Sequence, residues 1–190
     1  MGQGASYVGQ GGYCGNANSE RLRNYGQYDM MPDPNNVLNM KGGTLLGSVG
    51  QSSPLNVQTG GGGHIRLNVD ALNLVGENNH IQANGIPEKD ISESDVDDLD
   101  GGSGGYININ IENKYVKQNH IDYLAKIQAL GGYGKNKGVG GAGGIITFGN
   151  NVEYLNLEVT QTFGGSGGTI RNAAEQPNCG NGAPGTVFYD

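Results

Sequence analysis

GGSGGYININI, residues 101–111, joins a cluster of glycines to an alternation of isoleucine and asparagine. Strict alternation with a period of two is the pattern of a β-strand, because successive side chains of a strand point to opposite faces. One face of this strand would be apolar, while Asn108 and Asn110 would face outward or form ladders with neighbouring strands. The stretch therefore predicts a short strand that follows a glycine cluster and needs a partner to bury its isoleucines.

The same phrase recurs on both sides of this stretch. No copy is long enough to form a core alone, whereas stacked copies would bury their apolar faces in one continuous column. We expect the glycine clusters at corners, where the chain turns sharply with positive φ. The other copies are residues 60–69, 138–148, 164–170 and 182–189.

These repeats predict an all-β fold, a parallel β-helix or β-solenoid with glycine-rich corners and an irregular N-terminal cap. The solenoid is expected over residues 60–190 as one continuous domain. Residues 1–59 hold three of the six prolines, and residues 19–40 show no clear periodicity. We expect this part to form a glycine-rich start and a cap, because the last strand of a solenoid leaves unpaired backbone groups.

The composition excludes several other classes of protein. Glycine supplies 37 of 190 residues, far above its usual share of roughly 7%. A strict Gly-X-Y period is absent, which excludes collagen. The charged fraction of 15% and the recurring isoleucine, leucine and valine argue against a disordered chain.

The charge balance bears on partners. The net charge of −7 and the absence of a basic patch disfavour nucleic acid and anionic membrane surfaces. No stretch approaches the run of about 20 apolar residues that spans a bilayer. We therefore expect no nucleic-acid partner and no membrane insertion.

Five phrases share an order that points to a known kind of sequence. They are Gly4-Ala5-Ser6, Gly11-Gly12-Tyr13-Cys14, Gly60 to Gly63, Gly101 to Gly105 and the ending Cys179 to Asp190. Together they resemble a glycine-rich β-solenoid repeat region of large secreted or surface proteins of plants, ciliates and other protists. The resemblance implies an extracellular or cell-surface location and a structural role, and it supplies no catalytic residues.

An acidic run is the sharpest candidate for a metal site. It contains four aspartates, Asp95, Asp97, Asp98 and Asp100, and calcium prefers several carboxylate oxygens on a flexible loop. The alternative is a solvated acidic loop. His64, His80 and His120 match no zinc spacing, so no other cofactor is expected.

Two cysteines, Cys14 and Cys179, lie near opposite ends of the sequence. They are either free thiols, or a disulfide within the chain, or disulfides between neighbouring copies. In an elongated solenoid the two ends lie far apart, so a bond within one chain would need long arms. A disulfide of either kind would imply an oxidising compartment.

The leading functional hypothesis is an extracellular structural module whose copies assemble end to end into a filament or surface coat. The N-terminal glycine phrase and Thr186, Val187, Phe188 and Tyr189 are the expected contacts. The alternative is a carbohydrate-binding adhesin module, because the ten tyrosines suit stacking on extracellular glycans.

A third hypothesis is a β-helix enzyme that cleaves acidic polysaccharides. That chemistry needs convergent carboxylates or a base beside a neutralising cation. Arg66, Asp70 and Asp97 are the residues at hand, and nothing in their spacing brings them together. We therefore expect no enzymatic activity.

Overall fold

The computed structural model describes part of the chain: residues 2–3, 11–14, 47, 60–86, 99–111, 120–121, 125–135, 138–149, 160–168 and 180–189. Over these residues the protein consists of strands and extended segments, and none of them is helical. The prediction of an all-β fold is confirmed for this part of the chain.

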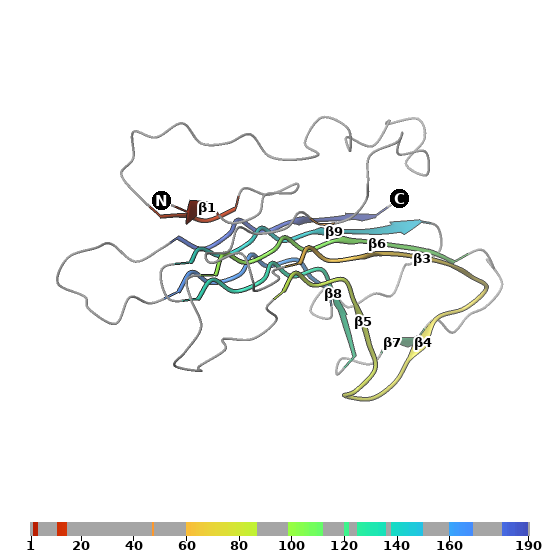
Figure 1. The fold of residues 1–190 in the computed structure, drawn as a ribbon. Coiled ribbons are helices and arrows are strands. Elements are labelled where there is room, and N and C mark those ends of the chain that lie inside the picture. Colours follow the sequence, from red (N-terminus) through yellow and green to blue (C-terminus); the bar gives the residue numbers. More distant parts are fainter. Residues whose placement is uncertain are drawn as a thin grey trace, which may run out of the picture.

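Two parallel sheets form the framework (Figure 1). The larger has the order β11-β9-β6-β3 and the smaller β10-β8-β5. Their strands are β3 (His64–Val69), β5 (His80–Gln82), β6 (Tyr106–Ile111), β8 (Lys126–Gln128), β9 (Ile145–Gly149), β10 (Thr160–Gln161) and β11 (Thr186–Tyr189). Two further pairs are the parallel β4 (Asn73–Leu74) with β7 (His120–Ile121), and the antiparallel β1 (Gly2–Gln3) with β2 (Tyr13–Cys14).

The register repeats from one strand to the next. Ile65, Ile107, Ile146 and Val187 occupy equivalent positions in the four strands of the larger sheet. These four side chains belong to one apolar cluster, as expected when repeated strands stack with the same face inward.

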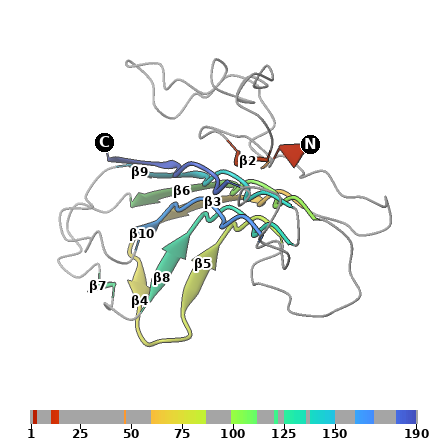
Figure 2. The ribbon, with the colours of Figure 1, turned by 90° about the vertical axis from the view of Figure 1, so that its left-hand side faces the viewer.

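The core lies between the two sheets (Figure 2). Ile107, Ile109 and Phe148 from the larger sheet and Ile127 from the smaller are at most 1% exposed. Burying an isoleucine or phenylalanine side chain stabilises the fold by roughly 1.5–3 kcal/mol. The alternation seen in the sequence at 106–111 therefore directs every second residue of β6 into this core.

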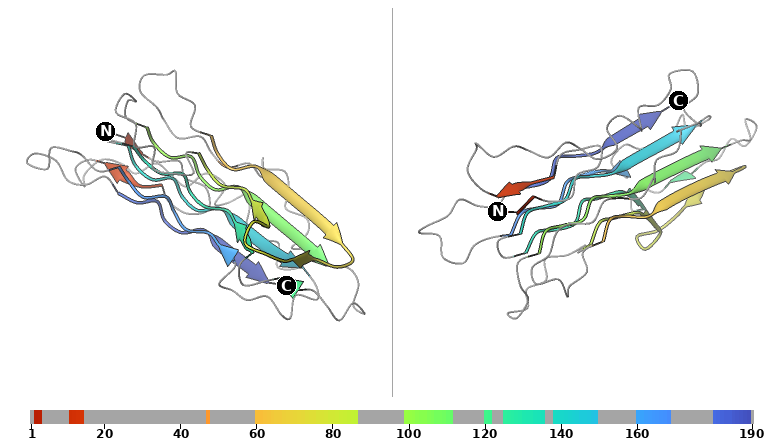
Figure 3. Two further views of the ribbon diagram at one scale, coloured as in Figure 1. Left: turned by 90° about the horizontal axis from the view of Figure 1, so that it is seen from below. Right: turned by 45° about the horizontal axis from the view of Figure 1, so that its top comes forward.

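Each glycine cluster continues a strand as a straight, extended segment (Figure 3). Four entering segments lead into the larger sheet: residues 60–63, 99–105, 138–144 and 180–185. Three leaving segments follow the smaller sheet: residues 83–86, 129–135 and 162–168. The prediction that these clusters form corners with positive φ is wrong, because among the described glycines positive φ occurs at Gly76, in the turn before β5.

The backbone hydrogen bonds of these segments repeat every three residues. Segment 138–144 donates in turn to two neighbouring segments and accepts from two others, with N···O distances of 2.7–3.2 Å. It donates from Gly140 and Gly143 N to Gly180 and Ala183 O, and from Gly141 and Gly144 N to Gly132 and Ala129 O. It accepts from Gly101 and Gly104 N at Val139 and Ala142 O, and from Gly165 and Gly168 N at Gly141 and Gly138 O. Three residues per turn is the period of a polyproline II helix, so the segments form a bundle of such helices.

Glycine is required because the backbones in this bundle touch. A Cβ atom added to Gly141 would lie 2.1 Å from the carbonyl oxygen of Gly102. One added to Gly131 would lie 2.0 Å from the carbonyl oxygen of Gly141. The bundle thus satisfies buried backbone groups through neighbours that only side-chain-free residues can approach.

Two described points of the N-terminal part pack on the entering segments. Gly12 donates to the carbonyl oxygen of Gly140 at 2.8 Å, and Gly47 donates to that of Gly62 at 2.7 Å. The two contacts lie on different segments of the bundle. Most of residues 1–59, and hence the predicted cap, lies outside the described residues.

Candidate functional site

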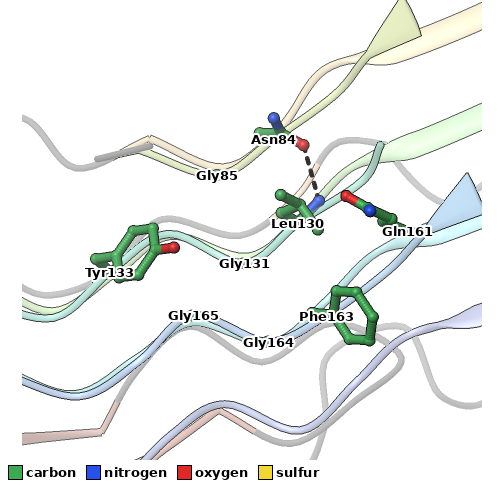
Figure 4. A pocket seen from close by; sticks show the side chains of 9 residues that line it. All are labelled: Asn84, Gly85, Leu130, Gly131, Tyr133, Gln161, Phe163, Gly164 and Gly165. Atoms are coloured by element: carbon green, nitrogen blue, oxygen red, sulfur yellow. Dashed lines mark hydrogen bonds between the residues drawn. The ribbon is translucent and has the colours of Figure 1, made fainter. Parts of the chain in front are cut away.

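A groove of about 220 Å³ lies along the leaving segments (Figure 4). Its floor is glycine, from three different segments. Tyr133 lies at one end, and Leu130, Gln161 and Phe163 gather at the other. The lining residues are Asn84, Gly85, Leu130, Gly131, Tyr133, Gln161, Phe163, Gly164 and Gly165.

The three-residue turn of the leaving segments explains which side chains line the groove. Leu130 and Tyr133 are one turn apart, and Leu130 lies beside Phe163 because Gly131 N donates to Phe163 O at 2.8 Å. The glycines between these positions pack against neighbouring backbone. Larger side chains every third residue therefore project from the bundle and form the walls of the groove.

The walls are aromatic and neutral. Phe163 is 63% exposed, and Tyr133 is half-buried. None of the groove's lining residues carries a charge. Such a surface suits an uncharged ligand with apolar faces and hydroxyl groups better than an ionic one.

A ladder of glutamine amides runs across the smaller sheet to the groove. Gln82, Gln128 and Gln161 occupy equivalent positions in β5, β8 and β10. Gln82 Nε2 donates to Gln128 Oε1 at 2.7 Å, and Gln128 Nε2 donates to Gln161 Oε1 at 2.6 Å. Every amide in the ladder therefore points the same way.

The ladder has two different ends. Within the described part of the chain, Gln161 Nε2 has no acceptor and Gln82 Oε1 has no donor. Among the described residues, the ladder thus ends in an N–H donor at one end of the smaller sheet and in a carbonyl acceptor at the other. Figure 4 shows the Gln161 amide at the edge of the groove.

The Asn84 side chain bonds to the backbone and does not belong to the glutamine ladder. Its Oδ1 accepts a hydrogen bond from the backbone N–H of Leu130 at 2.8 Å, the dashed line in Figure 4. The side chain thereby links two neighbouring leaving segments where the bundle meets the groove. We assign Asn84 to the framework of the groove.

A second polar cluster lies on the face of the larger sheet opposite the core. Thr147 Oγ1 is 2.9 Å from the Tyr106 hydroxyl and accepts from Asn108 Nδ2 at 2.7 Å. The rings of Tyr106 and His64 are 5.1 Å apart. Burial and, to a smaller degree, the Arg66 guanidinium hold the pKa of His64 below its usual value of 6.5.

The predicted calcium ligands divide into two groups. Asp95, Asp97 and Asp98 lie outside the described residues. Asp100 is 6% exposed, and its Oδ1 accepts from the backbone N–H of Val139 at 2.9 Å. Across the described ranges no group of three or more His, Cys, Asp or Glu side chains could hold a metal ion.

The other predicted site residues are placed as follows. Thr186, Val187, Phe188 and Tyr189 form β11, the outer strand of the larger sheet in the described structure. Cys14 ends β2, and Cys179 lies outside the described residues, directly before Gly180. Arg66 on β3 and Asp70 just after it are exposed, and Asp97 lies outside the described residues.

Sequence reasoning missed both the glutamine ladder and the groove. A signal for the ladder was present, because Ile81-Gln82-Ala83 and Ile127-Gln128-Ala129 repeat the same phrase. The groove carried no comparable signal, since its walls come from residues 84, 130–133 and 161–163 of three separate segments.

Within the described residues there is no helix long and apolar enough to cross a membrane. Comparison of the chain with known proteins found no matching family model, no matching curated protein and no matching solved structure.

Proposed function

We propose that the chain is an extracellular structural module, a parallel β-solenoid whose copies stack end to end into a filament or surface coat. The single observation that carries this proposal is the glutamine ladder, which ends in a donor on one side and an acceptor on the other. The extracellular location rests on the resemblance to glycine-rich repeat regions of secreted and surface proteins.

The strand edges support the same arrangement. In the described part of the chain β3 and β11 each pair with a strand on one side only. A second copy in the same orientation would place its β3 beside β11, and its Ile65 would extend the apolar column that ends at Val187. Open strand edges are ready templates for backbone pairing with another chain.

The ladder adds direction to this pairing. The same stacking would bring Gln82 of the second copy beside Gln161, so that Gln161 Nε2 donates to Gln82 Oε1. Stacked glutamine ladders of this kind stabilise repeated strands. Reversed copies would oppose donor to donor or acceptor to acceptor, so the ladder favours head-to-tail assembly.

Electron microscopy of the full chain tests the proposal. We expect filaments with a regular axial repeat from the wild type and loss of filaments from the double variant Gln82→Glu and Gln161→Glu, because two carboxylates would meet at each junction. Lys126→Glu is the matched control, since it makes the same change in net charge at an exposed position of the middle strand β8. Discrete short rods from the wild type at high concentration, or filaments from the double variant, would contradict the proposal.

A carbohydrate-binding adhesin module is the second candidate, and the groove favours it. Exposed Phe163 and half-buried Tyr133 offer stacking faces, and Gln161 Nε2 offers a donor to a sugar hydroxyl. Aromatic stacking with a few placed hydrogen bonds is how uncharged ligands are held in protein grooves. This function uses the same ladder end without needing a second copy.

Calorimetric titration with cellohexaose, chitohexaose and xylohexaose tests this candidate. Binding should weaken about tenfold in Phe163→Ala, the effect of losing one aromatic contact of about 1.4 kcal/mol. Val75→Ala is the control, because Val75 is 56% exposed and lies outside the groove. Absence of binding to all three sugars would remove this candidate and leave the filament proposal intact.

A further inference from the structure

The N-terminal glycine phrase touches the last glycine segment, although the two are far apart in sequence. A Cβ atom added to Gly12 would lie 2.1 Å from the carbonyl oxygen of Gly180 and 3.0 Å from the carbonyl carbon of Asn181. Gly12 N donates to Gly140 O, and Gly140 N donates to Gly180 O, at 2.8 and 3.2 Å. The contact is therefore fixed by hydrogen bonds through a shared neighbour.

This contact limits how far apart the two cysteines can be. Cys14 follows Gly12 by two residues, and Cys179 is bonded directly to Gly180. Consecutive Cα atoms are about 3.8 Å apart. The expectation that the two ends of the chain lie far apart is thus wrong at this point, and no long arms are needed.

The direction of the chain carries Cys14 toward the start of segment 180–185. β2 runs toward the start of segment 180–185, opposite to the course of that segment into β11 (Figure 3). Moving forward from Gly12 therefore leads toward the Gly180 end of that segment, the end to which Cys179 is covalently attached. With Gly12 beside the peptide that joins Gly180 to Asn181, Cys14 and Cys179 are the next cysteine-bearing positions on the two segments.

We propose that Cys14 and Cys179 form a disulfide within one chain. The proposal rests on the described backbone of residues 11–14 and 180–181 and does not depend on filament assembly or glycan binding. The bond would fasten the N-terminal part to the last segment of the bundle. It would close a loop over most of the chain, and long closed loops restrict the unfolded state most strongly.

The chemistry is thiol–disulfide exchange with an external disulfide such as oxidised glutathione. One cysteine thiolate attacks that disulfide, forms a mixed disulfide and releases one glutathione thiol. The second cysteine thiolate then attacks the protein sulfur of the mixed disulfide and releases the second glutathione thiol. The two cysteines together lose two protons and two electrons, and the oxidant is reduced to two thiols.

Peptide mass spectrometry of the full chain tests the proposal directly. The protein is refolded with oxidised and reduced glutathione, blocked with an alkylating agent and digested with trypsin without reductant. We expect a linked pair of peptides, residues 1–21 and 172–190, that separates on reduction. Two alkylated cysteines per chain, or a covalent dimer on a non-reducing gel, would overturn the proposal.

Thermal unfolding supplies a second measurement. Cys14→Ser and Cys179→Ser should each lower the melting temperature by on the order of 10 °C, and the double variant should fall no further. Reductant should lower the wild-type melting temperature by the same amount and leave the variants unchanged. Additive losses in the double variant would show that each thiol acts separately and would contradict a shared bond.

Discussion

At the residue scale, the difference between Gly62 and its neighbour Gly63 shows what the bundle demands. A Cβ at Gly62 would lie 2.0 Å from the carbonyl oxygen of Ala83, whereas a Cβ at Gly63 would meet no atom within 4 Å. We expect Gly62→Ala to destabilise the protein by about 3 kcal/mol, the upper range for overpacking a rigid site. Gly63→Ala should be neutral or slightly stabilising, because alanine restricts the unfolded chain.

Urea denaturation of both variants measures this difference. The two substitutions add the same methyl group at adjacent positions. A difference in stability between the two variants therefore cannot come from the helix or strand preference of alanine. Equal stabilities for the two variants would contradict the close backbone packing of the entering segments.

His64 predicts a pH dependence at the same scale. Its pKa is lowered in the folded protein, first by burial and then by Arg66. As the pH falls below about 6.5, the unfolded chain takes up a proton that the folded chain resists, so stability should decrease. Urea midpoints at pH 7.5 and 5.5 measure the decrease.

Two substitutions separate the effect of burial on the His64 pKa from the effect of Arg66. His64→Gln should reduce the loss of stability at pH 5.5, whereas Arg66→Gln should keep most of it because burial is the larger cause. A larger loss of stability at pH 5.5 in His64→Gln than in the wild type would contradict a lowered pKa of His64.

At the element scale, one hydroxyl joins β6 to β9 on the face opposite the core. Thr147 is 1% exposed and holds both the Tyr106 hydroxyl and Asn108 Nδ2. Thr147→Val keeps the shape and leaves both partners buried without this bond. We expect a loss of about 3 kcal/mol in unfolding free energy, because each unsatisfied buried polar group costs about 1–3 kcal/mol.

Thr186→Val is the matched control. Thr186 is a half-buried threonine of β11, and its side chain makes no hydrogen bond to the described residues. Its substitution should change the stability by less than about 0.5 kcal/mol. Equal losses in the two variants would mean that the hydroxyl of Thr147 has no special role.

At the scale of the whole molecule, the glycine segments differ in how many neighbours surround them. Segment 138–144 is buried throughout and is hydrogen-bonded to four other segments of the bundle, whereas segment 180–185 is partly exposed. We expect the amides of Gly141 and Gly144 to exchange with deuterium at least about tenfold more slowly than those of Gly182 and Gly185. Hydrogen exchange followed by NMR measures this, and faster exchange in the central segment would contradict the bundle.

The sequence by itself determined the strands and the class of fold. The alternation of apolar and polar residues at 106–111 reports which side chains face the core, because the period of a strand is a local property of the backbone. The equivalent runs at 64–69, 145–149 and 186–189 are strands for the same reason. Parallel pairing of these repeated strands was likewise predictable from their similarity.

The role of the glycines was decided by the tertiary structure. A glycine cluster is compatible both with a tight turn and with a straight segment that other backbones approach closely. Only the neighbouring segments distinguish the two, and those neighbours are supplied by distant parts of the chain, as Gly102 is for Gly141. The glycine clusters that the sequence predicted to be corners are therefore extended segments of the bundle.

The contacts on which the proposals rest were decided in the same way. The groove and the contact of Gly12 with Gly180 are formed by segments that lie far apart in the sequence. No pattern in these segments predicts that they meet. The ladder was visible as a repeated Ile-Gln-Ala phrase, but its direction comes from the pairing of β5, β8 and β10. Local periodicity determines which way a side chain points, whereas the partner it meets depends on how the whole chain packs.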